Sequence, residues 1–218
     1  MNIPLNSSVS MTLEDLKVEV EAEESDRVEV EINGRKVNPA RVERFISLAS
    51  RFYKVDKVKV KSWTNFPIGV GLASSAAFFS ALAYELNEIF SLGLEKRELS
   101  KLAGLGSGSA SRSVFDGYVI WHAGNCHDNS FAERIASREH WELVDVIKIF
   151  SRQKKKLSSA EGHKLALTSP LIKLKARVSE ENAREAVKAI MERDFEKLAK
   201  ISEEEAILLH YVAENTRQ

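Results

Sequence analysis

A loop of glycines and serines carries the first residues whose types and spacing suggest chemistry. Gly69 and Gly71 let the backbone turn tightly and approach a ligand closely, and Ser74 and Ser75 follow them. The apolar spacing over 75–90 predicts a helix directly after this loop. Hydroxyls and unpaired amides at a helix N-terminus favour an anion. A β-like run precedes the loop, so strand, loop and helix together predict a phosphate-binding site.

Other interpretations of this loop differ in what they require. A Walker loop would close with Gly-Lys-Ser/Thr, which is absent from the sequence here. The dinucleotide fingerprint needs a third glycine at a spacing that this segment does not have. For an isolated serine pair, simple capping of an apolar helix is the commoner role. The preceding glycines favour the phosphate-binding interpretation of Ser74 and Ser75.

A second group of polar residues follows about thirty residues later. It consists of Ser107, Gly108, Ser109 and Arg112. Composition alone would make this group a Gly/Ser linker with a surface arginine. However, the helix before it ends at a glycine, the chain resumes with residues 110–114, and the arginine lies one turn after Ser109. Because a guanidinium binds both oxygens of a carboxylate or phosphate, the group predicts a second anion site.

Two sequence blocks resemble a known family. Residues 65–77, Asn-Phe-Pro-Ile-Gly-Val-Gly-Leu-Ala-Ser-Ser-Ala-Ala, resemble the P-x-x-x-G-L-x-S-S-A motif of the GHMP kinases, a superfamily of small-molecule kinases. Residues 105–113, Leu-Gly-Ser-Gly-Ser-Ala-Ser-Arg-Ser, resemble the G-S-G-S-A-C-R-S signature of the diphosphomevalonate decarboxylases. The first motif indicates the superfamily, and the pair of motifs indicates the decarboxylase family.

The resemblance implies roles for these residues. Ser75 and Arg112 would be catalytic, and Arg112 would bind the carboxylate of the substrate, with Ser107, Gly108 and Ser109 as further substrate contacts. The ATP phosphates and their Mg²⁺ would be held by the first loop, at Gly71, Leu72, Ala73, Ser74 and Ser75. Magnesium keeps several waters and takes few protein ligands, so hydroxyls beside a phosphate are adequate.

Two further positions match the family less closely. Residues 154–162 resemble a K-x-x-S-S-x-x-G-M segment, in which Ser159 would contact the substrate. Ala160 and His163 depart from that segment, where Thr or Arg and Met are usual. Arg35 would correspond to a phosphate-binding arginine, and a surface role in a hairpin is the alternative.

The implied reaction is the ATP-dependent decarboxylation of mevalonate 5-diphosphate to isopentenyl diphosphate, in the mevalonate pathway of isoprenoid biosynthesis. The alternatives are a mevalonate 5-phosphate decarboxylase, a related mevalonate kinase, and a non-catalytic binding module of the same fold. The family also has a lysine near its N-terminus and an aspartate near its C-terminus, and neither has a counterpart in this sequence. We therefore expect a chain that lacks both ends of the family and has impaired activity.

Three residues have the spacing of metal ligands: His122, Cys126 and His127. A zinc site needs four protein ligands, or three and a water, and the sequence offers no second cluster. We expect no metal beyond ATP-bound Mg²⁺.

Composition excludes several other classes of protein. Lysine plus arginine equals aspartate plus glutamate at 32 each, so no overall charge attracts nucleic acid or an anionic membrane. The single cysteine excludes an internal disulfide framework, and we see no apolar run of membrane-spanning length. These features predict a soluble, cytoplasmic protein, and the resemblance implies an enzyme that binds small molecules and forms a homodimer.

The elements that must position these residues follow from periodicity and turn signals. Strands are expected over 16–21, 27–32, 35–37, 55–63, 118–121 and 143–150, with the first two antiparallel. Helices are expected over 39–52, 75–90, 95–105, 131–135, 159–168, 181–192 and 195–215. This mixture predicts an α+β fold. By resemblance it is the GHMP kinase fold, with an N-terminal domain like domain 2 of ribosomal protein S5 (1–152) and a smaller, incomplete C-terminal α+β domain (153–218).

Overall fold

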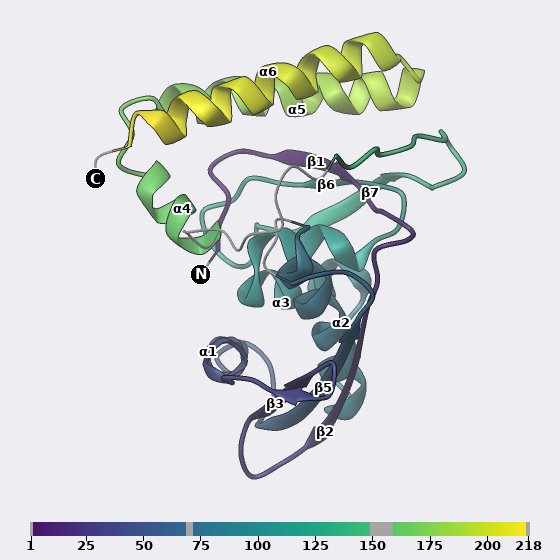
Figure 1. The fold of residues 1–218 in the computed structure, drawn as a ribbon, viewed down its shortest axis with the longest axis vertical. Helices are drawn as coiled ribbons and strands as arrows, with labels where there is room; N and C mark the ends of the chain where they lie inside the picture. Colours follow the sequence, from purple (N-terminus) through teal and green to yellow (C-terminus); the bar gives the residue numbers. More distant parts are fainter. Residues whose placement is uncertain (1, 69–71, 149–158, 217–218) are drawn as a thin grey trace.

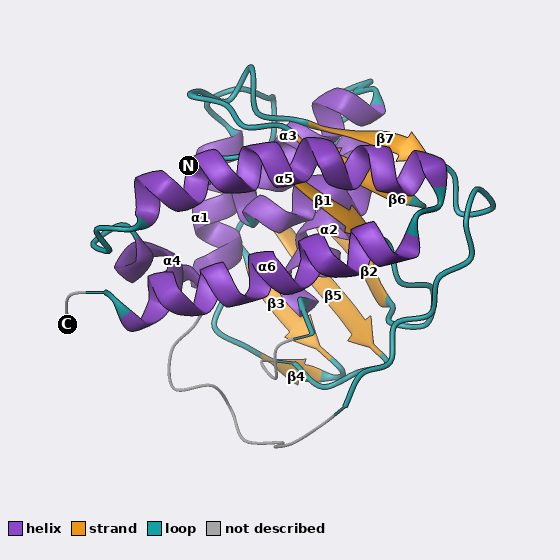
Figure 2. Ribbon diagram, turned by 90° about the horizontal axis from the view of Figure 1, so that it is seen from above, coloured by secondary structure: helices purple, strands orange, loops and turns teal. Residues whose placement is uncertain are grey.

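The computed structural model describes residues 2–68, 72–148 and 159–216. Its strands form two sheets, and helices lie between and above them (Figures 1 and 2). The strands are β1 (Ser8–Met11), β2 (Val18–Glu24), β3 (Glu29–Ile32), β4 (Arg35–Lys36), β5 (Val58–Thr64), β6 (Tyr118–Trp121) and β7 (Ala132–Ala136). The helices are α1 (Ala40–Ala49), α2 (Ser74–Ile89), α3 (Lys96–Gly106), the 3-10 helix η1 (Gly108–Val114), α4 (Ser159–Ala166), α5 (Ile172–Glu192) and α6 (Phe195–Glu214).

The larger sheet has the strand order β2-β5-β3-β4. The predicted strands β2 and β3 are present but do not pair with each other, because β5 lies between them, antiparallel to β2 and parallel to β3. Val58 and Val60 of β5 are fully buried. This apolar strand therefore occupies the protected centre, and the charged β2 lies at the edge.

A two-residue turn joins β3 and β4, which were both expected to be strands. Asn33 and Gly34 both have positive φ, 49° and 76°, as a two-residue turn between antiparallel strands requires. The chain then enters α1, whose apolar residues Val42, Phe45, Ile46 and Ala49 are all buried. Phe52, the last residue of the predicted helix, lies beyond the end of α1 and is exposed.

A single core joins α1, α2 and α3 to the larger sheet. The Phe45 and Phe79 rings meet edge to face, with centroids 5.2 Å apart. Leu82 and Leu86 of α2 are fully buried, as the predicted apolar stripe requires. This core packs α2 against the larger sheet and so fixes the position of the helix.

The smaller sheet has the order β1-β6-β7, and two of its strands were not predicted. Residues 131–135 were expected to be helical, but β7 pairs antiparallel with β6, with Ala132 opposite Trp121. A five-residue segment is too short for its periodicity to distinguish helix from strand. The polar segment of residues 1–12 contains β1, which pairs with β6. Its strand character comes from that distant partner.

The predicted strand over 143–150 is wrong for 143–148, which adopt neither helix nor strand. Val144 and Val146 are 81% and 84% exposed. A strand needs a neighbour to complete its hydrogen bonds, and none of the described strands pairs with this segment. Residues 149 and 150 lie outside the described residues.

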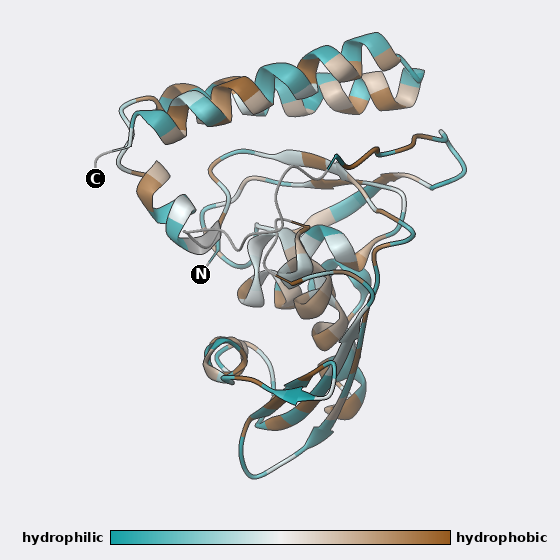
Figure 3. Cartoon of the chain, viewed as in Figure 1, coloured by the Kyte–Doolittle hydropathy of each residue, from teal (hydrophilic) through white to brown (hydrophobic). Residues whose placement is uncertain are grey.

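An antiparallel pair of helices, α5 and α6, lies over the smaller sheet (Figure 1). Both are amphipathic, with polar and apolar residues alternating along them in Figure 3. Helix α5 begins nine residues before the predicted start of 181, at Ile172. Arg193, in the left-handed conformation, ends α5, and the Asp194 carboxylate caps α6 by accepting from the Lys197 amide at 3.0 Å. The expected domain boundary at 152/153 lies outside the described residues, so the division remains a prediction.

Candidate nucleotide and acid-binding site

The serine pair after the loop lies inside α2 rather than at its N-cap. Helix α2 starts at Ser74, and its N-cap is Ala73, which adopts the left-handed conformation at φ 51° and has no side-chain capping bond. An alanine methyl group cannot accept a hydrogen bond, so no side chain of the N-cap residue occupies the first-turn amides. The geometry therefore does not support a simple capping role for Ser74 and Ser75.

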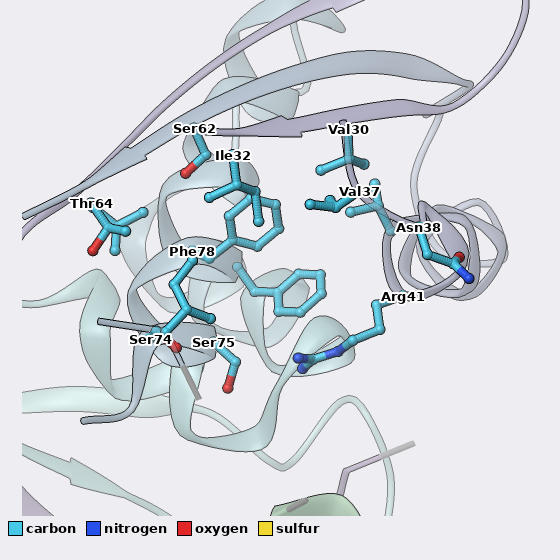
Figure 4. A pocket seen from close by; sticks show the side chains of 14 residues that line it. Val30, Ile32, Val37, Asn38, Arg41, Ser62, Thr64, Ser74, Ser75 and Phe78 are labelled. Atoms are coloured by element: carbon cyan, nitrogen blue, oxygen red, sulfur yellow. The ribbon is translucent and has the colours of Figure 1, made fainter. Parts of the chain in front are cut away.

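A cavity of about 180 Å³ lies between the larger sheet, α1 and the start of α2 (Figure 4). Most of its wall is apolar and includes Val30, Ile32, Val37, Phe78 and Phe79. At one end, the polar side chains of Ser74, Ser75 and Arg41 line it. The cavity thus offers an apolar wall to a flat group and a polar end to an anion.

Arg41 is a site residue that the sequence interpretation did not single out. Its guanidinium lies 5.3 Å from the centroid of the Phe79 ring and extends toward Ser75 in Figure 4. Partial desolvation lowers the pKa of Arg41, although an arginine stays charged at neutral pH. One signal was available: Arg41 precedes the buried Phe45 by four residues, so both lie on one face of α1.

The two predicted serine groups meet in the structure. The Ser75 Oγ lies 3.5 Å from the Ser107 Oγ, and the Ser107 Oγ lies 3.3 Å from the Ser109 Oγ. The first residue belongs to α2, and the other two lie at the junction of α3 and η1. The fold thus brings residues more than thirty positions apart into one line of hydroxyls.

Arg112 lies on η1, next to the smaller sheet. Its Nη1 donates to the Ser8 Oγ at 2.7 Å, and its guanidinium lies 5.6 Å from the Trp121 ring centroid. Burial lowers the pKa of Arg112, but the guanidinium keeps its charge. Because Ser8 is a neutral partner, the positive charge of this half-buried group is available to an anion.

Gly108 is required by packing. A Cβ at this position would lie 2.6 Å from the Trp121 ring and 3.3 Å from the Asn2 side chain. A side chain here would therefore displace the indole over which Arg112 lies. Packing explains the glycine without any need for a ligand to approach its backbone.

The remaining predicted site residues lie in different parts of the structure, and not all of them are described. Leu72 and Ala73 lie at the start of α2, and Gly71 lies outside the described residues. Arg35 is exposed on β4 and is not among the residues that line the cavity. Ser159 is the first residue of α4. The Ser159 side chain, like Gly71, lies outside the described part of the structure.

Of the three residues with metal-like spacing, the two histidines have separate partners. The His122 Nε2 lies 2.7 Å from a Glu133 oxygen, and the His127 Nε2 lies 3.0 Å from the Tyr53 hydroxyl. Cys126 is exposed. In the described part of the chain, no three His, Cys, Asp or Glu side chains are grouped so that they could hold a metal ion.

None of the helices in the described ranges combines the length and apolar character needed to cross a membrane.

The fold and the paired serine motifs define the class: this is a GHMP kinase fold with a smaller C-terminal part. A family model for the diphosphomevalonate decarboxylase-like N-terminal domain matches residues 1–132. A second, for the mevalonate 5-diphosphate decarboxylase C-terminal domain, matches residues 145–218. The chain belongs to the diphosphomevalonate decarboxylase family.

Curated relatives and solved structures agree with this assignment. The diphosphomevalonate decarboxylase of Candida albicans is 35% identical over 236 residues, covering 97% of this chain and 65% of the relative. The Homo sapiens enzyme is 39% identical over 159 residues, covering 71% of this chain and 39% of the relative. The Staphylococcus aureus mevalonate diphosphate decarboxylase superposes with a TM-score of 0.86 at 27% identity, covering 98% of this chain and 67% of that one. The chain thus spans less than two thirds of the length of these curated relatives.

Proposed function

We propose that this chain carries out the ATP-dependent decarboxylation of mevalonate 5-diphosphate to isopentenyl diphosphate. The observation that supports this most directly is the 3.5 Å separation of the Ser75 and Ser107 hydroxyls, since it brings the nucleotide loop next to the acid-binding group. A solved relative described as MDDEF in complex with MVAPP, AMPPCP and magnesium has a TM-score of 0.85 to this chain at 29% identity.

The nucleotide is assigned to the cavity and the loop beside it. The apolar wall formed by Val30, Ile32 and Phe78 suits the flat base. Residues 71–75 would hold the phosphates through backbone amides at the start of α2, where the helix dipole favours negative charge. Arg41, at the polar end of the cavity, adds a positive charge to the favourable end of the α2 dipole.

The acid substrate is assigned to the neighbouring group. It would contact Ser107, Gly108 and Ser109. The Arg112 guanidinium would bind its carboxylate through two parallel hydrogen bonds, in the bidentate geometry. Arg35 and Ser159 remain proposed contacts for its phosphates. The substrate would then lie with its hydroxyl near Ser75, next to the γ-phosphate of ATP.

Magnesium is proposed as the companion of ATP. In the described cavity the groups available near the phosphates are hydroxyls, including those of Ser74 and Ser75, and no carboxylate lines it. Such a site fits Mg²⁺, which binds mainly to phosphate oxygens and water and needs few protein ligands. When bound, the ion would neutralise charge on the β- and γ-phosphates.

The proposed reaction has two stages, and the protein acts mainly by positioning. The γ-phosphate of ATP is transferred to the tertiary hydroxyl of the substrate, giving ADP. The C–O bond to that phosphate then breaks, and the electron pair of the C–CO₂ bond forms the new double bond as CO₂ leaves. Arg112 fixes the carboxylate so that the breaking C–CO₂ bond is aligned with the leaving phosphate.

Turnover of candidate substrates tests the proposal and separates it from its alternatives. We expect ADP, phosphate and CO₂ in equal amounts with mevalonate 5-diphosphate and ATP. ADP without CO₂ would indicate a kinase, and preference for mevalonate 5-phosphate would indicate the monophosphate enzyme. Binding of ligands without turnover, at enzyme concentrations that would reveal one turnover per hour, would indicate a non-catalytic module.

We further propose that the protein works in the cytoplasm as a homodimer. The reducing environment suits the exposed thiol of Cys126, and the family resemblance supports the dimer. Light scattering during size-exclusion chromatography tests the assembly, since a dimer would have twice the 24.5 kDa mass of the chain.

A further inference from the structure

A buried serine just before the first strand joins the C-terminal helix pair to the sheet beneath it. Ser7 immediately precedes β1 and is 5% exposed. Its amide donates to the Glu180 Oε2 at 2.6 Å, and its hydroxyl lies 3.2 Å from the Glu180 Oε1. The same hydroxyl accepts from the Ala123 amide at 3.0 Å. One carboxylate of α5 thus holds both the amide and the hydroxyl of Ser7.

The next residue contacts the substrate-binding arginine. Ser8 is the first residue of β1, and its Oγ accepts from the Arg112 Nη1 at 2.7 Å. Ser8 is also paired with Trp121, the residue over whose ring the Arg112 guanidinium lies. The position of Ser8 therefore determines where the guanidinium is held.

We propose that Glu180 is a positioning residue for Arg112: by holding Ser7, it fixes Ser8 and thereby the guanidinium that binds the substrate carboxylate. The bonds are suited to this task, because hydrogen bonds to a carboxylate are about twice as strong as those between neutral groups. Ser7 and Ser8 are adjacent, so a shift of one is transmitted to the other through the backbone. The role in catalysis rests on the proposed function, whereas the effect on Arg112 does not.

Two neighbouring residues of α5 serve as matched controls. Glu181 is exposed and carries the same charge as Glu180. Arg184 has an exposed side chain and lies 3.7 Å from the Glu180 Oε1, one turn along the helix. Arg184→Ala removes this ion pair but leaves both contacts with Ser7. If the net charge of α5, rather than the contact with Ser7, controlled Arg112, both Glu181→Ala and Arg184→Ala would also change the behaviour of Arg112.

Arginine side-chain NMR tests the effect on Arg112 without any ligand. The Nη1–H signal of Arg112, which belongs to the group that donates to the Ser8 Oγ, is assigned by its loss in Arg112→Lys and should exchange with water slowly in the wild-type chain. We expect exchange to be at least about fivefold faster in Glu180→Ala and in Ser8→Ala, because the loss of a hydrogen bond to a charged group costs more than one kcal/mol. Glu181→Ala and Arg184→Ala should match the wild type. An unchanged Arg112 signal in a folded Glu180→Ala variant would overturn the proposal.

Ligand affinity, measured by calorimetry on the same variants, tests the link to function. In Glu180→Ala we expect mevalonate 5-diphosphate to bind about tenfold more weakly, as a hydrogen bond to a charged group would predict, while the affinity for an ATP analogue stays the same. General loosening of the fold would weaken both ligands and would contradict a positioning role. Glu180→Gln, which keeps one acceptor oxygen, should restore part of the affinity. Faster exchange at Arg112 without any binding by the wild type would refute the proposed function but not the role of Glu180.

Discussion

Two arginines distinguish the site in the structure from the site inferred from sequence. Arg35 was singled out by resemblance, yet it lies exposed on β4. Arg41 lines the cavity near Ser75 and contacts the Phe79 ring. Sequence alone does not show that α1 turns this arginine toward α2. The helical face was predictable, but the element that it faces was not.

These two arginines give the first prediction. Arg41→Ala should weaken binding of an ATP analogue about tenfold, as expected for the loss of a charged hydrogen-bond donor to a phosphate. Arg35→Ala serves as the matched control and should change that affinity less than about twofold, as expected for an exposed surface charge. Calorimetric titration of both variants measures the difference. Equal effects in the two variants would show that Arg41 has no special role.

A buried histidine gives a prediction about pH. His127 lies against Phe52 and bonds to the Tyr53 hydroxyl, and burial lowers its pKa while Lys101 lowers it further and Asp128 and Glu98 oppose the shift. Because the folded-state pKa is lower than the unfolded one, the unfolded chain binds more protons. The contribution of His127 is therefore complete above the unfolded value of about 6.5 and is lost as pH falls below it.

Urea unfolding at pH 7.5 and pH 5.5 measures this effect. We expect the free energy of unfolding to fall between these two values in the wild type, and to fall less in His127→Gln, which cannot be protonated. The same decrease in both proteins would assign the pH dependence to other groups.

At the scale of elements, the backbone conformation of single residues sets where helices begin and end. Arg193 ends α5 with φ 58°, and Ala73 precedes α2 with φ 51°. The left-handed conformation costs a residue with a side chain about 1 kcal/mol or more. At Arg193 this conformation ends α5 and lets the chain turn back into α6, which packs along α5. At Ala73 it directs the start of α2 toward the proposed phosphate site.

The end of α5 provides a test of that cost. Arg193→Gly should raise the free energy of unfolding by about 0.5–1 kcal/mol, because glycine adopts positive φ without strain. Arg177→Gly, in the exposed middle of the same helix, should lower it by about 1 kcal/mol. Opposite signs in denaturant titrations would support the assignment, whereas destabilisation by both would argue against a left-handed Arg193.

Two glycines provide a further test at this scale. Gly108→Ala should destabilise the fold by about 1–3 kcal/mol, because the methyl group would press against the Trp121 ring. Gly162, inside α4, has open space around the position of a Cβ, so Gly162→Ala should stabilise by about 0.5–1 kcal/mol. Thermal unfolding measures both changes. A neutral Gly108→Ala would indicate that Trp121 lies elsewhere.

At the scale of the whole molecule, short-range sequence patterns predicted several elements correctly, whereas strands that depend on a pairing partner were missed. The Asn33-Gly34 turn, the α1 face and the α2 stripe follow from short-range pattern, and all three are present. β1 forms because β6, far away in sequence, pairs with it, and β7 pairs with the other edge of β6. Ser75 meets Ser107 because α2 packs against α3 and η1, and the bond from Arg112 to Ser8 depends on the pairing of β1 with β6. Pattern thus suggested candidate site residues, whose roles stay predictions, and tertiary packing decided which groups contact them.

The central claim is that the two serine groups and Arg112 form one site that binds a nucleotide beside a small acid. Calorimetry with mevalonate 5-diphosphate, with and without a non-hydrolysable ATP analogue, tests it most directly. We predict that the wild type binds both ligands at once, and that Arg112→Gln binds the acid about a hundredfold more weakly, as for the loss of a bidentate charged contact, with its affinity for the nucleotide unchanged. Equal affinity of the wild type and Arg112→Gln for the acid, or mutually exclusive binding of the two ligands, would contradict the account.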